Sequence, residues 1–171
     1  MSRLPAEWER QSGVQLTWPH CDTEWYELEK VLECYVDIAS NILKYEPLMI
    51  VTRDIDECKA DIARITERKG IVLDVDSIRF YESPLNDTWA RDHGGISVFG
   101  DGGQKYLYDF VFNGWGLKFA SDLDNQLTKN IFSQGAFEDD VMGVDMRPYV
   151  LEGGSIDSDG CGTMLTTTEC L

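Results

Sequence analysis

The sequence predicts an α/β fold. Strand-like apolar runs alternate with amphipathic helical segments, in the order strand, helix, strand, helix, strands, helix, strands. One pattern also recurs, because two segments each carry an acidic residue beside a pair of glycines, followed by a predicted β-hairpin. No linker or low-complexity segment interrupts the 171 residues, so we expect a single domain over residues 1–171, in which 43% hydrophobic residues supply a core.

The first helix is predicted from its apolar spacing. Residues 13–19 read as a short strand that ends at a proline, and Asp22 or Thr23 stands where a helix cap is expected. Beyond the cap, apolar residues recur every three or four positions and so share one helix face. That face is formed by Trp25, Leu28, Leu32, Tyr35, Ala39 and Ile42.

Further elements follow in order. Residues 48–51 form a predicted buried strand, and residues 55–68 a second amphipathic helix that ends at Gly70. The inward face of this helix consists of Ile55, Cys58, Ile62 and Ile65. Residues 71–75 and 78–81 are predicted strands.

The second half of the chain alternates hairpins with one helix. Asp101-Gly102 is a predicted turn before a strand over residues 105–112, and Asp159-Gly160 is the matching turn before residues 163–167. Between the two hairpins we expect a helix over residues 122–132 and a strand over residues 141–146.

The two acid–glycine segments hold the candidate site residues. Asp92 lies just before the pair Gly94–Gly95, and Glu152 lies just before Gly153–Gly154. Each segment precedes a strand, an Asp-Gly turn and a second strand, so the two carboxylates occupy nearly equivalent positions of an internal repeat. Glycine pairs allow a sharp turn or a close backbone approach.

The net charge of −16 limits the partners. Binding to nucleic acid or to an anionic membrane surface relies on clustered Lys and Arg, so we expect neither partner. A small cationic ligand is favoured instead, although many acidic proteins carry such charge only for solubility.

The cysteines and histidines indicate a reduced compartment and no metal. No close pairs occur among the five cysteines, which are Cys21, Cys34, Cys58, Cys161 and Cys170. No secretory signal is recognised either, so we expect free thiols and a cytoplasmic location. His20 and His93 lack ligand-spaced partners, so we expect no zinc site, and we expect no cofactor.

Several of these stretches carry a resemblance to a known family. Residues 5–9, 13–20, 86–94, 112–116 and 151–167 together resemble the N-terminal half of agmatine deiminases and the related bacterial peptidylarginine deiminase-like proteins. The resemblance implies a pentein fold, a five-bladed α/β propeller, of which this chain would form roughly the first half as a partial propeller. The acid–glycine repeat is what two neighbouring blades would produce.

The resemblance also implies a reaction. Members of the family convert agmatine to N-carbamoylputrescine and ammonia: a cysteine thiolate attacks the guanidinium carbon, and a histidine acts as general acid and base. By motif match, Asp92 and Glu152 would hold the substrate guanidinium. The family's catalytic histidine and cysteine would lie beyond Leu171, so we expect this chain alone to be inactive.

Other residues have two possible roles. Trp89 and Trp115 can contact a substrate or fill the core, and Asn113 can bind substrate or backbone. His93 adjoins Asp92 and is a candidate general base, but a structural hydrogen bond in its loop is the alternative. The cysteines on helices are more typical of small core residues than of nucleophiles.

The substrate remains open among guanidines. Gly95 and Asp157 stand where agmatine deiminases usually carry proline and histidine, which favours the peptidylarginine deiminase-like branch, with free or peptide-linked arginine as alternatives to agmatine. An alternative function of a different class is a noncatalytic module that binds calcium, since Ser155, Asp157 and Asp159 match part of an EF-hand loop. An inactive fragment and a homo-oligomer also remain possible.

Overall fold

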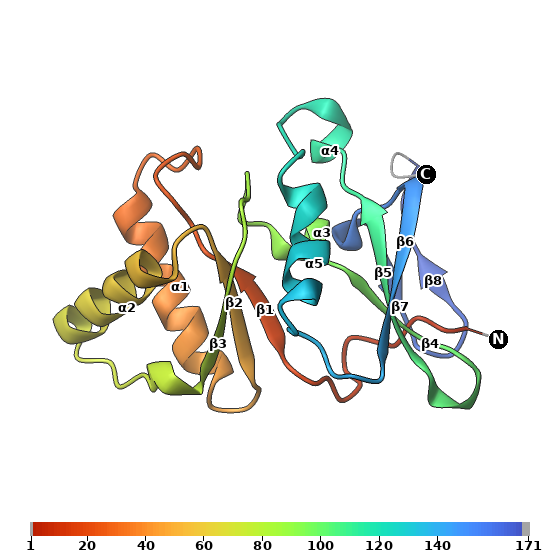
Figure 1. Cartoon of the computed structure of the whole chain (residues 1–171), viewed down its shortest axis with the longest axis horizontal. Coiled ribbons are helices and arrows are strands. Elements are labelled where there is room, and N and C mark those ends of the chain that lie inside the picture. Colours follow the sequence, from red (N-terminus) through yellow and green to blue (C-terminus); the bar gives the residue numbers. More distant parts are fainter. Residues whose placement is uncertain (1, 169–171) are drawn as a thin grey trace. The chain divides into compact units, whose positions relative to one another are not determined.

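The computed structural model describes residues 2–168 and divides into two compact units. The first unit spans Gln11–Thr88, and the second combines the first ten residues with Trp89–Leu171. The elements of both are labelled in Figure 1. The single domain predicted over residues 1–171 stays a prediction, because two such units can belong to one domain.

The first unit is a parallel sheet with two helices. Its strands are β1 (Val14–Thr17), β2 (Leu48–Thr52) and β3 (Ile78–Glu82), in the order β1-β2-β3. Helices α1 (Leu28–Ile42) and α2 (Ile55–Lys69) connect successive strands and lie together on one face of the sheet (Figure 1). Consecutive strand order with right-handed crossovers places both helices on the same side.

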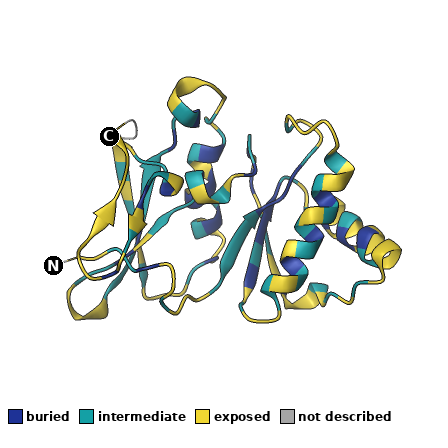
Figure 2. Ribbon diagram, turned by 180° about the vertical axis from the view of Figure 1, so that it is seen from behind, coloured by how far each residue is buried: buried dark blue, intermediate teal, exposed yellow. Residues whose placement is uncertain are grey.

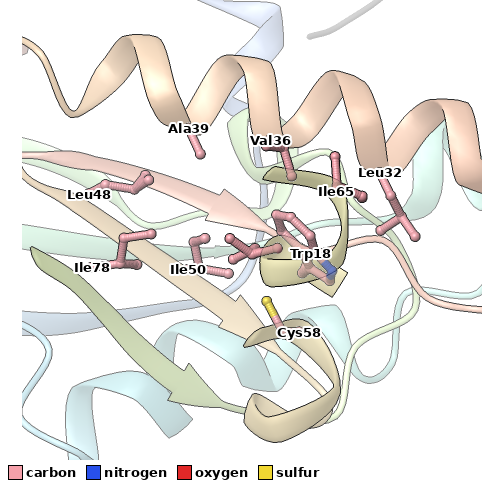
Figure 3. Packing of buried hydrophobic residues seen from close by; sticks show 10 residues of the cluster. Trp18, Leu32, Val36, Ala39, Leu48, Ile50, Cys58, Ile65 and Ile78 are labelled. Carbon is pink, nitrogen blue, oxygen red and sulfur yellow. The ribbon is translucent and has the colours of Figure 1, made fainter. Parts of the chain in front are cut away.

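The core of the first unit lies between this sheet and its two helices. Figure 3 shows Leu32, Val36 and Ala39 of α1 above the strand residues Leu48 and Ile50. In Figure 2 the buried residues of both helices lie on their sheet-facing sides, and the exposed residues lie on the outer sides. The predicted helical spacing therefore identified the packed face of α1 correctly except for Trp25, which lies outside the helix.

Helix α2 matches the sequence prediction closely. Its side-chain cap is Asp54, which accepts the N–H of Glu57 at 2.9 Å, and it ends at Gly70 with φ of 66°. That left-handed conformation favours glycine, which explains the stop. Of the predicted inward residues, Cys58, Ile62 and Ile65 are fully buried.

The predicted start of α1 was wrong. The helix begins at Leu28, not after Asp22 or Thr23, because both side chains are used elsewhere. Asp22 forms an ion pair with Arg53 at 2.6 Å, and the Thr23 hydroxyl donates to the carbonyl of His20 at 2.5 Å. Trp25 therefore precedes the helix and is 37% exposed.

The strand predicted over residues 71–75 was also wrong. The sheet contains only β1, β2 and β3 within the described residues, and the segment that follows α2 leads into the 3₁₀ helix η1 (Val75–Ser77). The Asp74 carboxylate accepts the N–H of Asp76 at 3.2 Å and caps this turn. Apolar residues alone did not make a strand, since Val72 is 98% exposed.

The second unit contains a mixed sheet in the order β4-β5-β6. Strand β4 (Ile96–Phe99) pairs antiparallel with β5 (Lys105–Val111) across the 3₁₀ turn η2 (Asp101–Gly103), and β5 pairs parallel with β6 (Val141–Val150). Helix α5 (Asp124–Ser133) forms the crossover, with Leu127 and Ile131 fully buried. The first predicted hairpin and this helix are therefore confirmed.

Short elements complete the second unit. Helices α3 (Ala90–His93) and α4 (Gly114–Leu117) and the 3₁₀ turn η3 (Gly153–Ser155) precede or follow the sheet strands. Strands β7 (Asp157–Ser158) and β8 (Met164–Leu165) form the second predicted hairpin, which is shorter than expected. The α/β class is confirmed, whereas the partial propeller stays a prediction.

Within residues 2–168, none of the helices is long and apolar enough to cross a membrane.

Candidate functional site: two carboxylates joined by one tryptophan

Asp92 is positioned by the single turn of α3. The N–H groups of Asp92 and His93 donate to the carbonyl of Trp89 at 2.9 and 3.3 Å, which closes the turn. The turn points the two neighbours in different directions: Asp92 is half-buried, whereas His93 is 4% exposed, with its ring centroid 6.1 Å from that of Phe112. The carboxylate is thus accessible and the imidazole is part of the interior.

Glu152 is positioned by the end of β6. Leu151 continues the pairing with β5 by donating its N–H to Val111 at 3.1 Å, and Glu152 follows directly. The Glu152 carbonyl then accepts the N–H and the hydroxyl of Ser155 at 3.0 and 2.6 Å, which turns the chain into η3. The half-buried side chain therefore projects from a fixed loop.

The loop after β5 reaches the same place as the loop after β6. The two strands are parallel, and Val111 is paired with Val150 near their carboxyl ends. Loops that follow adjacent parallel strands leave the sheet at the same edge. This topology brings Trp115, four residues after Val111, beside Glu152.

Trp115 contacts both acidic residues. Its backbone N–H donates to Glu152 Oε1 at 3.1 Å, and its indole Nε1–H donates to Asp92 Oδ2 at 3.3 Å. Asp92 and Glu152 belong to different copies of the acid–glycine repeat, yet one residue supplies a donor to each. All three side chains are half-buried and lie in the second unit.

The loop that carries Trp115 has an unusual backbone. Trp115 has φ of 55° and Leu117 has φ of 63°, in the left-handed region that side-chain-bearing residues seldom adopt. Asn113 supports the loop, because its Oδ1 accepts the N–H of Gly116 at 2.8 Å. Of its two predicted roles, the structure shows Asn113 binding backbone, and a substrate contact through its amide nitrogen stays a prediction.

Two phenylalanines hold the indole ring. Phe112 and Phe119 meet Trp115 edge to face, with centroid distances of 5.0 and 5.6 Å and interplanar angles of 86° and 88°. Such T-shaped pairs are a favoured aromatic arrangement. Phe112 is itself buried, so the ring of Trp115 is joined to the interior of the unit.

The glycine pair after Glu152 allows the two acid loops to approach closely. A Cβ on Gly153 would lie 2.2 Å from the carbonyl oxygen of Arg91, and a Cβ on Gly154 would lie 2.1 Å from Asp92 Oδ1. Both distances are far below van der Waals contact. The sequence indicated that these glycines allow a sharp turn or a close backbone approach. Only the structure shows that the element that approaches them is α3.

Arg91 adds a polar link between three segments. Its guanidinium lies 2.6 Å from Glu7 Oε1 and donates to the carbonyl of Ile156 at 3.0 Å. The sequence indicates that Arg91 holds its loop through an ion pair or backbone hydrogen bonds, but it does not identify the partners, because Glu7 and Ile156 are remote from Arg91 along the chain. The result is that the cation next to Asp92 is held by the N-terminal segment and the second acid loop.

Comparisons with known proteins agree with this architecture. The family model for the Porphyromonas-type peptidyl-arginine deiminase matches residues 3–171. The chain belongs to this family. The agmatine deiminase of Pseudomonas savastanoi is 35% identical over 174 residues, which cover 98% of this chain and 44% of the relative.

Solved structures of relatives have the same fold over this region. A protein from Porphyromonas gingivalis is 41% identical with a TM-score of 0.81, covering 98% of this chain and 47% of its own. A substrate-bound agmatine deiminase of C. jejuni is 32% identical with a TM-score of 0.78, and the match covers 97% of this chain and 45% of the relative. The chain therefore spans less than half the length of these relatives.

Trp89 and His93 are the remaining candidate site residues. Trp89 is 50% exposed, and its carbonyl closes the α3 turn that carries Asp92. Its predicted substrate contact stays a prediction. The buried position of His93 favours the structural alternative over a general base that meets a ligand directly.

The described cysteines differ in exposure. Cys58 is fully buried, and this burial raises the pKa of its thiol far above the ordinary range, which suppresses the thiolate. Cys21, Cys34 and Cys161 are exposed, and Cys170 lies outside the described residues. The prediction that the cysteines on helices are core residues is thus confirmed for Cys58 and wrong for Cys34, which lies on an exposed side of α1.

The partial EF-hand match forms an ordinary turn. Asp159 Oδ1 accepts the N–H groups of Cys161 and Thr163 at 2.7 and 2.9 Å, which lowers the pKa of the carboxyl. These contacts close the β7–β8 hairpin. Over residues 2–168 the structure contains no group of three His, Cys, Asp or Glu side chains arranged to hold a metal ion.

Gly95 also has a local explanation. A Cβ at this position would lie 2.7 Å from Cγ of Leu107, a buried residue of the neighbouring strand. Leu107 thus occupies the space that a side chain at position 95 would need. This packing accounts for the glycine at the first departure from the usual agmatine deiminase pattern.

Proposed function

We propose that Asp92 and Glu152 hold the guanidinium group of a small cationic substrate, with agmatine as the leading candidate, in a guanidine deiminase. The observation that carries the proposal is that both carboxylates accept an N–H from the same residue, Trp115. A guanidinium is planar and presents five N–H donors in a fixed fork. Two convergent carboxylates match that fork.

The electrostatics of the loops support a cationic ligand. The charges of Asp92 and Glu152 are both negative, and the two groups are bridged by neutral N–H donors of Trp115. The adjacent cation, Arg91, is directed to Glu7 and Ile156. A bound guanidinium would supply the positive charge that offsets the acid pair.

In the reaction that we propose, the carboxylates orient the central guanidinium carbon. A thiolate attacks this carbon, the C–N bond to one amino group breaks with release of ammonia, and water then cleaves the C–S bond to give the ureido product. We assign the nucleophile to none of the described cysteines. The agmatine deiminases among the relatives support agmatine. The family's name supports peptide-linked arginine as an alternative, and the Porphyromonas gingivalis relative, described as an arginine deiminase, supports free arginine.

Calorimetric titration of the chain with agmatine tests the binding step. Putrescine is the matched control ligand, since it has the same four-carbon chain with an amine in place of the guanidinium. Arginine and an arginine-containing peptide address the alternative substrates. We expect agmatine to bind more tightly than putrescine.

Charge-removing variants test the residues. Asp92→Asn and Glu152→Gln keep the side-chain shape, and each should lower agmatine affinity by at least about tenfold, because a hydrogen bond to a charged group contributes about 1.5–3 kcal/mol. Asp101→Asn, in the exposed η2 turn, is the control for a general loss of negative charge. Equal affinity in the wild type and both site variants would overturn the proposal.

A further inference from the structure

Trp115 is the residue through which the two acid loops meet. Its two N–H donors come from different parts of the residue, the backbone for Glu152 and the indole for Asp92. The relative positions of the two carboxylates therefore depend on the conformation of a single residue. Any rotation of its side chain changes the contact with Asp92 and leaves the contact with Glu152.

The conformation of Trp115 is held from several sides. Its left-handed backbone is supported by the Asn113 cap, and a Cβ on Gly114 would lie 2.3 Å from the carbonyl oxygen of Phe119. The indole is set by its edge-to-face contacts with Phe112 and Phe119. A seldom-used backbone conformation that its surroundings maintain is typical of functional loops.

We propose that Trp115 is a positioning residue for the guanidinium-binding carboxylates. Its backbone N–H and indole N–H fix the orientation and separation of Glu152 and Asp92, so it acts on the ligand through these two groups. This inference rests on the proposed function and goes beyond it. A direct contact between Trp115 and the substrate needs only the aromatic ring, whereas positioning of Asp92 needs the indole N–H.

The physical reason lies in the repulsion between the carboxylates. Two like charges that converge on one ligand repel each other when the ligand is absent, and hydrogen bonds to ionised groups are stronger than those between neutral groups. Donors from one rigid residue keep both carboxylates directed to the same place. The ligand then meets a preformed pair, which reduces the cost of ordering on binding.

Trp115→Phe separates the two roles. Phenylalanine keeps an aromatic ring and the backbone N–H to Glu152 but removes the indole N–H to Asp92. We expect agmatine affinity to fall about three- to tenfold, with little change in the weak binding of putrescine. Trp8→Phe is the matched control, since Trp8 belongs to the same unit and is 78% exposed.

Phe119→Leu is a second variant that keeps both donors. It removes one of the two edge-to-face contacts, and Phe119 is 46% exposed, so the fold should tolerate the change. We expect a smaller loss of agmatine affinity than in Trp115→Phe, because the indole N–H is still present but its orientation is less restricted.

Nuclear magnetic resonance of the chain supplies a readout that needs no ligand. The indole ¹H–¹⁵N signal of Trp115 is the one that disappears in Trp115→Phe. This signal should shift in Asp92→Asn, and the backbone amide signal of Trp115 should shift in Glu152→Gln. The Trp8 indole signal should stay in place in both variants.

The outcomes distinguish this inference from the proposed function. If Asp92→Asn leaves the Trp115 indole signal unmoved, the bridge is wrong. If the signal moves but Trp115→Phe binds agmatine as tightly as the wild type, the positioning role is wrong and the proposed function stands. If the wild type binds no agmatine, the proposed function is overturned and the positioning of a ligand falls with it.

Discussion

The backbone of Gly154 lies against the carboxylate of Asp92, so closely that a Cβ at position 154 would be 2.1 Å from Asp92 Oδ1. The indole of Trp115 meets the other oxygen, Oδ2, at 3.3 Å. Asp92 is thus held between the second acid loop and the loop after β5. The absence of a side chain at position 154 is a condition for the arrangement of the two acids.

Gly154→Ala should disturb the acid pair directly. Because φ at Gly154 is not in the left-handed region, the expected effect comes from the collision with Asp92 and not from backbone strain. We expect a loss of agmatine affinity of about tenfold or more and a shift of the Trp115 indole signal. Gly143→Ala is the control, since its Cβ would meet three ring atoms of Phe132 at 3.3, 3.5 and 3.6 Å, much farther than the 2.1 Å at Gly154. Unchanged affinity and an unmoved signal would contradict the close approach.

Arg91 should contribute modestly to the stability of the second unit. The side chains of Arg91 and Glu7 are 54% and 61% exposed, and exposed ion pairs typically contribute about 0.2–1 kcal/mol. A double-mutant cycle with Arg91→Met and Glu7→Gln, measured by urea unfolding, should give a coupling energy in that range. A coupling energy near zero would show that the Ile156 carbonyl is the more important partner of Arg91.

The first unit should lose stability in mild acid because of His20. Burial, followed by the charge of Arg53, lowers the pKa of His20 below its ordinary value, so the folded state favours the neutral imidazole. Its Nδ1 accepts the N–H of Asp22 at 3.2 Å, which also requires an unprotonated nitrogen. The contribution is fully present above the unfolded pKa of about 6.5 and is lost as pH falls from there through the folded pKa.

Urea unfolding at several pH values between about 7.5 and 5 tests this expectation. Replacing His20 with Asn removes the titrating group, so the variant should show a flatter dependence of unfolding free energy on pH. An equal slope in both proteins would assign the acid sensitivity to other groups.

The chain alone should release no ammonia from agmatine, free arginine or an arginine peptide. The second unit carries Asp92 and Glu152. Among its described residues the only cysteine is Cys161, which lies in the turn between β7 and β8. Two carboxylates can hold a guanidinium but cannot expel ammonia from it without a nucleophile. Ammonia release that disappears in Cys161→Ser would show that this expectation misplaces the nucleophile.

The chain should self-associate through its exposed apolar residues. In the described residues β6 pairs only with β5, and several apolar side chains on β6 and β8 are at least half exposed. These are Met142, Tyr149, Val150, Met164 and Leu165. Unpaired strand edges and apolar patches favour association. Sedimentation velocity should show larger species as the protein concentration rises. Tyr149→Lys should form fewer of these larger species. The control Val72→Ser, in the first unit, should behave as the wild type.

Local patterns predicted much of the fold. Helix α2 could be placed because its cap, its apolar spacing and its final glycine all act within a few residues of one another. The start of α1 could not, because Asp22 pairs with Arg53, a residue far along the chain. The strand expected over residues 71–75 did not form, because Asp74 caps the η1 turn and Val72 remains exposed instead of packing.

By itself the sequence determined the α/β class, the repeat that carries Asp92 and Glu152, and the membership of a guanidine-modifying family. These depend on residue types and short spacings. The tertiary structure decided that Trp115 meets both acids and that Gly154 seats one of them, because these contacts require the parallel pairing of β5 with β6 and a left-handed backbone at Trp115. These contacts leave no local signature, since the residues that meet come from three segments far apart in the chain.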